Sequence, residues 1–262
     1  MPTPCIFCDN NSGSREHLWA KWIHERHDFG PLKMDRYDQP QIIIPDPEIT
    51  VKTPCGQCNN GWMSDLEAVN IPIIGSMFND LSITLDQDMQ RKIAEWTVKT
   101  AMMLDSTRPK AAGAWFYLKN DCRAMRESLT IPEHTRIWIG RSDEKHLLAL
   151  GTDYQYLQAD THQVHGKSTI TTIVVGHFVV QSITQRKMPA FDHLDMPVLQ
   201  SKSGNWDAYL LPIWPSERVI VWPPQKTFTN GGPEGIAYLM DRWRTGERVD
   251  KITFEENHSE SP

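Results

Sequence analysis

Cys5-Ile6-Phe7-Cys8 and Cys55-Gly56-Gln57-Cys58 are the stretches that decide how the first part of this chain folds. Each is a Cys-x-x-Cys pair, a spacing that brings two thiolates close enough to share one metal ion. Structural zinc takes four protein ligands in a tetrahedron, so two such turns complete its coordination. A loop-rich segment of this length has little core of its own, and metal binding would stabilise it. We therefore predict one structural zinc site at Cys5, Cys8, Cys55 and Cys58.

The composition is that of an ordinary soluble globular protein. The chain has 262 residues, 39% of them hydrophobic and 23% charged. Its N-terminus has neither the basic nor the apolar region of a secretory signal, so we expect a cytoplasmic protein with reduced cysteines. Cys122, the fifth cysteine, is interpreted as an incidental thiol. The net charge of −6 argues against coating nucleic acid through bulk positive charge, although local patches or bound cations can still attract phosphate.

The pattern along the chain predicts an α+β fold in four segments. Residues 1–85 form an N-terminal zinc module, residues 86–109 a connecting helix, residues 110–254 a mostly antiparallel β-rich domain, and residues 255–262 a disordered tail. Strands are expected at 41–44, 49–52, 114–118, 135–139, 147–150, 171–180 and 218–222. Helices are expected after Cys58, after a Thr84-x-x-Gln87 capping box, and at 235–244. Ile93, Trp96, Thr100 and Met103 form one stripe of the second helix.

An acidic residue and a histidine, Glu16 and His17, lie between the cysteine pairs, eight residues after Cys8. Such a pair alone is a weak signal, but Asn59 follows the second cysteine pair at once. With this arrangement the sequence resembles the HNH family of ββα-metal nucleases over about residues 5–70. It also resembles an uncharacterised bacterial and phage branch, through Cys58-Asn59-Asn60-Gly61-Trp62-Met63 and Trp96-Thr97-Val98-Lys99-Thr100.

The resemblance implies a fold and a set of residue roles. In the family, a treble-clef zinc scaffold presents the acidic–His pair from a strand that faces the first turn of a helix. His17 would be the general base, since a neutral imidazole can take a proton from water near neutral pH. Glu16 and Asn59 would offer hard oxygen ligands to a catalytic Mg²⁺ or Mn²⁺. The products would carry 5′-phosphate and 3′-hydroxyl ends. Apart from the resemblance, Arg15 beside this pair is a candidate to bind a phosphate of the substrate, and an exposed or scaffold-bound arginine is the alternative.

Three features depart from the family pattern. Asn59 stands where the motif name has its final His, and no Asn occurs between His17 and Cys55, so the middle Asn is missing. The segment that joins His17 to Cys55 is longer than in compact members. Close to the site, Glu67, two turns beyond Asn59, is expected to be a surface carboxylate, with assistance to the metal as the alternative. Trp19, Trp22 and Trp62 are expected to pack around the small zinc core.

The leading functional prediction is a metal-dependent endonuclease that acts on DNA rather than RNA, in phage defence or a mobile element. Two alternatives stay open. The chain could be a zinc module that binds nucleic acid or a protein without cutting, or a nuclease subunit that is silent until a partner engages. The sequence is equally compatible with a homodimer. Residues 110–254 carry no motif linked to chemistry, so this half would select the substrate or recruit the partner.

Overall fold

The computed structural model describes residues 3–30, 32–36, 39–44, 49–107, 115–157, 162–191 and 206–229, together with Leu239. Over these residues the chain is a mixed α/β protein whose sheets are antiparallel. The helix expected at 235–244, apart from the helical residue Leu239, and the tail at 255–262 lie outside the described part.

The largest element is a long antiparallel hairpin of β6 (Thr135–Leu157) and β7 (Val164–Lys187), extended by β8 (Leu210–Trp214) on the other edge of β6. The expected strands at 135–139, 147–150 and 171–180 are parts of these two strands. The register of this pair shifts between Arg141 and His146 and again between Tyr156 and Leu157. Opposite that shift Gly176 has φ +63°, and a Cβ there would lie 2.6 Å from a ring carbon of Phe78. Glycine thus allows helix and sheet to approach closely.

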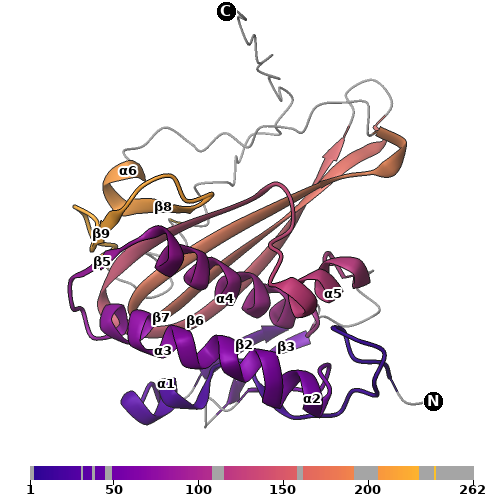
Figure 1. The fold of residues 1–262 in the computed structure, drawn as a ribbon, viewed down its shortest axis with the longest axis horizontal. Helices are drawn as coiled ribbons and strands as arrows, with labels where there is room; N and C mark the ends of the chain where they lie inside the picture. The colour runs from indigo at the N-terminus through magenta and orange to yellow at the C-terminus, as the bar shows by residue number, and fades with distance from the viewer. Residues whose placement is uncertain are drawn as a thin grey trace, which may run out of the picture.

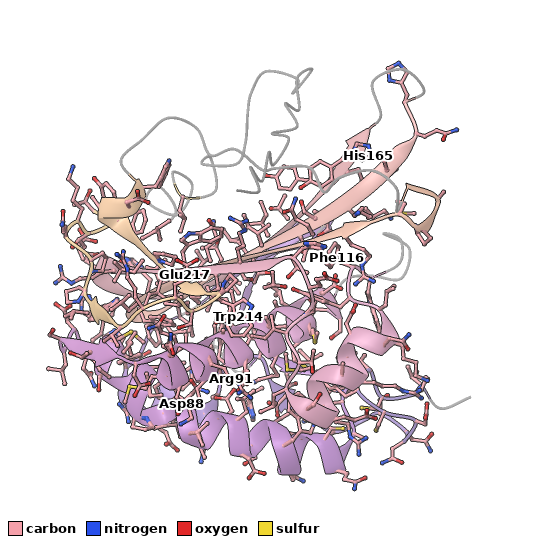
Figure 2. The ribbon with its side chains drawn as sticks, turned by 45° about the horizontal axis from the view of Figure 1, so that its top comes forward. Asp88, Arg91, Phe116, His165, Trp214 and Glu217 are labelled. Atoms are coloured by element: carbon pink, nitrogen blue, oxygen red, sulfur yellow. The ribbon has the colours of Figure 1, made fainter. Side chains whose placement is uncertain are left out.

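Two helices, α3 (Ser64–Phe78) and α4 (Gln87–Asp105), lie across one face of this hairpin (Figure 1). The predicted stripe of α4 is buried, with Ile93, Trp96, Thr100 and Met103 each at most 2% exposed. Asp88 and Arg91 lie on its solvent side (Figure 2). The predicted capping box is wrong. Thr84 belongs to β5 (Ile83–Leu85), which pairs with β9 (Ile220–Trp222), and the helix is capped by Asp86, whose carboxylate accepts from Met89 N–H at 2.8 Å.

The strand expected at 114–118 is absent over the described residues 115–118, which form a loop before α5 (Lys119–Ser128). The aromatic side chains that suggested a strand belong to this loop and are buried in the core: Phe116 is 7% and Tyr117 is 5% exposed. Asp105 accepts a hydrogen bond from Tyr117 N–H at 3.1 Å and so anchors the loop to α4. Strand propensity largely reflects side-chain burial, and here a loop provides that burial.

The N-terminal part is built from short elements: β1 (Glu16–His17), α1 (Lys21–Arg26), β2 (Leu32–Arg36), β3 (Gln39–Ile44), β4 (Thr50–Val51) and α2 (Gly56–Cys58). A further helical turn, η1 (Asn59–Met63), is kinked at Gly61 and runs into α3. The remaining short helices are η3 (Pro189–Phe191) and α6 (Trp206–Tyr209).

One continuous apolar cluster joins the N-terminal part to the helices and the hairpin. It includes Phe7 and Met63 as well as Trp96, Phe178 and Trp222. The expected packing of the tryptophans near the cysteines is confirmed, because Trp19 is 2% exposed and Trp22 and Trp62 pack against the same cluster. The elements that carry the candidate site therefore pack against the same hydrophobic core as the helices and the hairpin.

Candidate metal centre and adjacent polar network

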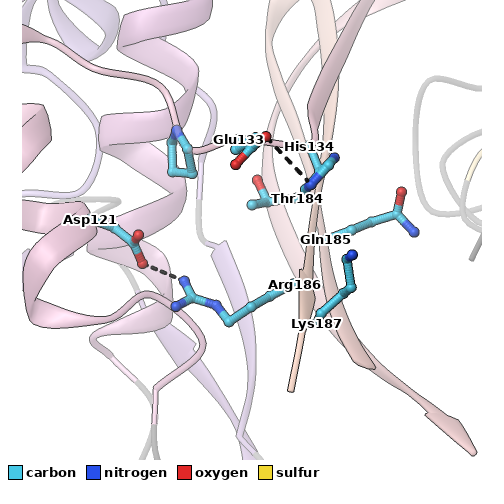
Figure 3. A pocket seen from close by; sticks show the side chains of 8 residues that line it. Asp121, Glu133, His134, Thr184, Gln185, Arg186 and Lys187 are labelled. Atoms are coloured by element: carbon cyan, nitrogen blue, oxygen red, sulfur yellow. Dashed lines mark hydrogen bonds and ion pairs between the residues drawn. The ribbon is translucent and has the colours of Figure 1, made fainter. Parts of the chain in front are cut away.

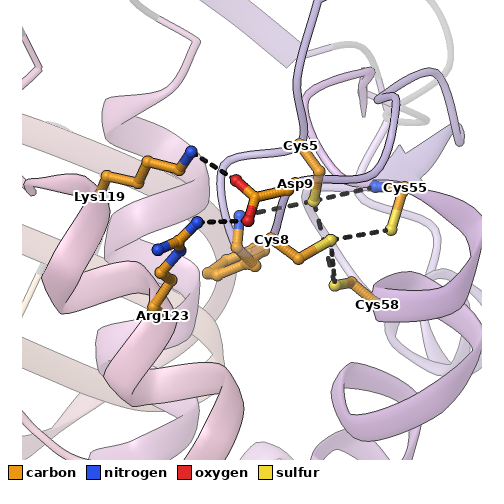
Figure 4. A network of polar contacts seen from close by, with 8 residues as sticks. Cys5, Cys8, Asp9, Cys55, Cys58, Lys119 and Arg123 are labelled. Atoms are coloured by element: carbon orange, nitrogen blue, oxygen red, sulfur yellow. Dashed lines mark hydrogen bonds and ion pairs between the residues drawn. The ribbon is translucent and has the colours of Figure 1, made fainter.

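The four predicted cysteines meet in one buried cluster (Figure 4). All four Sγ atoms lie within 4.8 Å of one another. The Sγ of Cys8 is 3.6 Å from that of Cys55 and 3.7 Å from that of Cys58, and the Sγ atoms of Cys5 and Cys58 are 3.9 Å apart. None of the four is in a disulfide. A zinc–sulfur bond of about 2.3 Å gives a tetrahedron with edges of about 3.8 Å, so these thiols have the spacing of a four-thiolate metal site.

The protein backbone supports these sulfurs. The N–H groups of Phe7 and Cys55 donate to the Sγ of Cys5 at 3.4 and 3.2 Å. Burial raises the pKa of the Cys5 and Cys58 thiols, whereas hydrogen bonds from Cys58 N–H and the neighbouring thiols outweigh burial at Cys55 and lower its pKa to about 7. Donors directed at sulfur favour thiolate ligands and orient them, as the outer shell of a metal site does.

Asp9, in the first cysteine turn, ties this cluster to helix α5 (Figure 4). Its carboxylate accepts from Lys119 Nζ at 2.6 Å and also from Arg123. These cations lower the pKa of Asp9. The Asp9 side chain is 72% exposed, so the bridge contributes to register and orientation more than to stability.

The β1–β4 ribbon holds the predicted acidic–His pair. Glu16 pairs with Val51 and His17 with Thr50. Side chains alternate along a strand, so Glu16 and His17 lie on opposite faces, and Glu16 shares its face with its cross-strand partner, the buried Val51. Arg15 is exposed, and Glu16 and His17 are half-buried. Burial raises the pKa of the Glu16 carboxyl to about 7. Lys99 lowers that pKa and Glu67 raises it.

Asn59 reaches the same strand from the beginning of the helix. Its amide nitrogen donates to Ser14 Oγ at 2.8 Å and to the Arg15 carbonyl at 3.4 Å. The structure therefore brings Asn59 beside the residues that precede Glu16. In the described part of the chain its side-chain hydrogen bonds end on Ser14 and Arg15, and none reaches Glu16.

Glu67 is part of a charged network between α3 and α4, and its predicted surface position is wrong. Its side chain is 16% exposed, and its Oε1 accepts from Lys99 Nζ at 2.5 Å and from Trp96 Nε1 at 3.0 Å. Lys99 is itself only 3% exposed. One sequence signal could have found this network: Trp96 and Lys99, three residues apart, place a charge on the buried face of an amphipathic helix.

A polar pocket of about 410 Å³ lies between α5 and the end of β7 (Figure 3). Arg186 is ion-paired with Asp121 there, and His134 lies 3.8 Å from the carboxylate of Glu133. The residues that line it are Asp121, Pro132, Glu133, His134, Thr184, Gln185, Arg186 and Lys187. It includes none of the site residues predicted from the sequence.

Within the part of the chain that the structure describes, no helix is both long and apolar enough to cross a membrane. No protein-family model matches the chain, and neither a curated protein sequence nor a solved structure is significantly similar to it.

Proposed function

We propose that this protein is a metal-dependent endonuclease of the HNH type that hydrolyses phosphodiester bonds in DNA. The observation that carries the proposal is the meeting of three features in one small region. The four-thiol cluster anchors the beginning of a helix, and the side chain of Asn59 at that beginning bonds to Ser14 and Arg15. Glu16 and His17 follow these two residues directly and form β1. The proposal includes a structural zinc at the four cysteines, held in a treble-clef arrangement.

The donor groups suit both metals of such an enzyme. Four buried thiols at tetrahedral spacing match zinc, which prefers soft ligands. A hard divalent cation, Mg²⁺ or Mn²⁺, prefers oxygen, which Glu16 offers as carboxylate and Asn59 as amide carbonyl. The side-chain nitrogen of Asn59 already donates to Ser14 and Arg15, so its side-chain oxygen is the atom that would bind a cation. Bound there, a cation would stabilise negative charge on the scissile phosphate.

The residues of the chain would divide the remaining work. His17 takes a proton from a water molecule whose oxygen forms the new bond to phosphorus. The bond from phosphorus to the 3′ oxygen breaks, so the products are a 5′-phosphate and a 3′-hydroxyl. Arg15, which is exposed and directly precedes β1, positions a phosphate of the backbone.

The test is cleavage of supercoiled plasmid and of single-stranded DNA with added Mg²⁺ or Mn²⁺. Wild type should cut only with added cation. His17→Ala should be slower by about 100-fold or more, as expected when a general base is lost. His27→Ala removes an exposed histidine just after α1 and should cut like wild type. All three proteins must first contain zinc at equal stoichiometry.

A second candidate is a zinc module that binds nucleic acid, or a protein partner, without cutting it. It is favoured by the half-buried Glu16 and by the hydrogen bonds of Asn59, which end on Ser14 and Arg15. If the wild-type protein contains zinc, binds DNA in a gel-shift assay and leaves the DNA uncut with every cation tested, the binding module replaces the nuclease as the proposed function.

A further inference from the structure

Helix α5 carries three basic residues on one side. Lys119, Arg123 and Arg126 follow one another at spacings of four and three residues, which makes them neighbours along the helix. The side chains of Lys119 and Arg123 are 52% and 39% exposed, whereas Cys122 and Met125 of the same helix are buried. The net charge of the chain is −6, so any attraction for phosphate depends on such local groups of cations.

Two of these cations bind one carboxylate. Lys119 Nζ donates to Oδ1 of Asp9 at 2.6 Å, and Arg123 Nη2 donates to Oδ2 of the same side chain (Figure 4). The two basic side chains are therefore already arranged around a single anionic group, with one donor for each of its oxygens. A phosphate group also presents several negatively charged oxygens close together, so the same donors can bind it through charge-assisted hydrogen bonds.

The bridge to Asp9 is easily displaced. The Asp9 side chain is 72% exposed, and exposed ion pairs contribute little because water and salt screen them. Asp9 can therefore turn into solvent without leaving a buried charge unpaired. A DNA backbone, by contrast, brings a row of phosphates and releases counterions where cations neutralise them, so it competes well for exposed basic side chains.

Arg126 extends the group of cations by one helical turn. It is half-buried, and its side chain makes no ion pair or hydrogen bond in the described part of the chain. Of the two acids on α5, Asp121 is paired with Arg186, and Glu127 is exposed. Three positive charges thus face two negative ones, Asp9 and Glu127, and the positive excess grows when Asp9 turns away.

We propose that Lys119, Arg123 and Arg126 bind backbone phosphates of DNA, and that Asp9 is an internal competitor that occupies this site while no DNA is bound. The identity of the ligand rests on the proposed function. The site lies beside the cysteine cluster, because Asp9 directly follows Cys8 (Figure 4). It adds a DNA contact from outside the resembling motif, and this contact would position the DNA without reading its sequence, as phosphate contacts do.

The test measures binding of a short fluorescent DNA duplex to the zinc-loaded full chain by fluorescence anisotropy. No Mg²⁺ or Mn²⁺ is added, so the DNA stays uncut, and each variant must contain as much zinc as wild type. Arg126→Gln breaks no ion pair. It should weaken binding by about five- to tenfold at about 0.1 M salt, the effect of losing one phosphate contact. It should also reduce the slope of log Kd against log salt by about one.

Asp9→Asn should have the opposite effect. It removes the competing charge with little change of shape and should tighten DNA binding by about two- to fivefold, since an exposed ion pair competes only weakly. Damage to the fold would not produce such a gain. When Lys119→Gln and Arg123→Gln are both present, Asp9→Asn should no longer tighten binding, because the cations that it frees are gone.

The matched control is Asp88→Asn on α4. Asp88 is 68% exposed and pairs with Lys92 at 2.6 Å, so this substitution breaks a similar bridge and changes the net charge by the same amount. It should leave the affinity for DNA unchanged if the effect of Asp9 is local to α5.

The outcomes separate this inference from the proposed function. The α5 site is overturned if Asp9→Asn binds DNA no more tightly than Asp88→Asn, or if Arg126→Gln keeps the affinity and salt dependence of wild type. In either case, cleavage that is lost in His17→Ala would leave the nuclease proposal standing. If neither wild type nor Asp9→Asn binds DNA, and wild type does not cut it, both proposals fail.

Discussion

Lys99→Met tests the buried ion pair between α3 and α4 by a change that keeps the length and apolar stem of the side chain. The Glu67 side chain is 16% exposed in the structure, and the variant leaves its carboxylate with Trp96 Nε1 as the remaining donor. Removing one partner of a buried pair costs about 3–5 kcal/mol, because the other charge stays buried without compensation. We expect the lower end, about 3 kcal/mol, since some of Glu67 still reaches water.

A loss of about 3 kcal/mol in the free energy of unfolding corresponds to a fall in Tm of about 6–12 °C for a domain of this size. The assay is thermal unfolding of zinc-loaded protein, followed by circular dichroism. Lys92→Met is the matched control, with the same substitution on the same helix. Lys92 pairs with Asp88 at 2.6 Å, but the two side chains are 36% and 68% exposed, so the midpoint should hardly change.

Adding Glu67→Gln to Lys99→Met removes the charge left behind. The double variant should therefore be more stable than Lys99→Met by about 1 kcal/mol or more, the sign of direct coupling between contacting residues. The reasoning would be refuted by a double variant less stable than Lys99→Met, or by equal effects of Lys99→Met and Lys92→Met.

Three further predictions concern the cysteine cluster, the sheet and the acid range. Cys58→Ser should lose the metal, as measured by elemental analysis. It should also make the N-terminal part susceptible to proteolysis, because the cluster organises a segment of short elements. Metal retained at wild-type stoichiometry would contradict the four-thiol site. Gly176→Ala should destabilise the fold by about 2–4 kcal/mol in urea unfolding, since φ is +63° and the new Cβ would meet Phe78; an unchanged midpoint would count against the close approach of α3 to β7. Arg141 lowers the pKa of Asp80 below its ordinary value of 3.8, so this pair stabilises the fold above that pH, and the stabilisation is lost as pH falls through the lowered pKa. Asp80→Asn suits the residue's φ of +61° and should flatten the fall of stability in that acid range; a slope equal to that of wild type would show that the pair does not matter.

Local spacing determined much of the candidate site. Two Cys-x-x-Cys turns predicted the cluster of four cysteines, and the structure confirms that their sulfurs meet. The apolar stripe of α4 and the strand patterns within β6 and β7 were read correctly for the same reason, because periodicity depends on neighbours along the chain. The identity of the metal and the nuclease activity stay predictions.

Tertiary packing decided the rest. Phe116 and Tyr117 read as strand residues, but a loop buries them, and the helix begins at Lys119 instead. Glu67 read as a surface carboxylate because nothing in its own segment shows that Lys99 and Trp96 lie across from it. Side-chain identity and spacing report contacts within one turn or one strand. Which distant charges share a buried site depends on how α3 and α4 pack, and only the folded structure shows that.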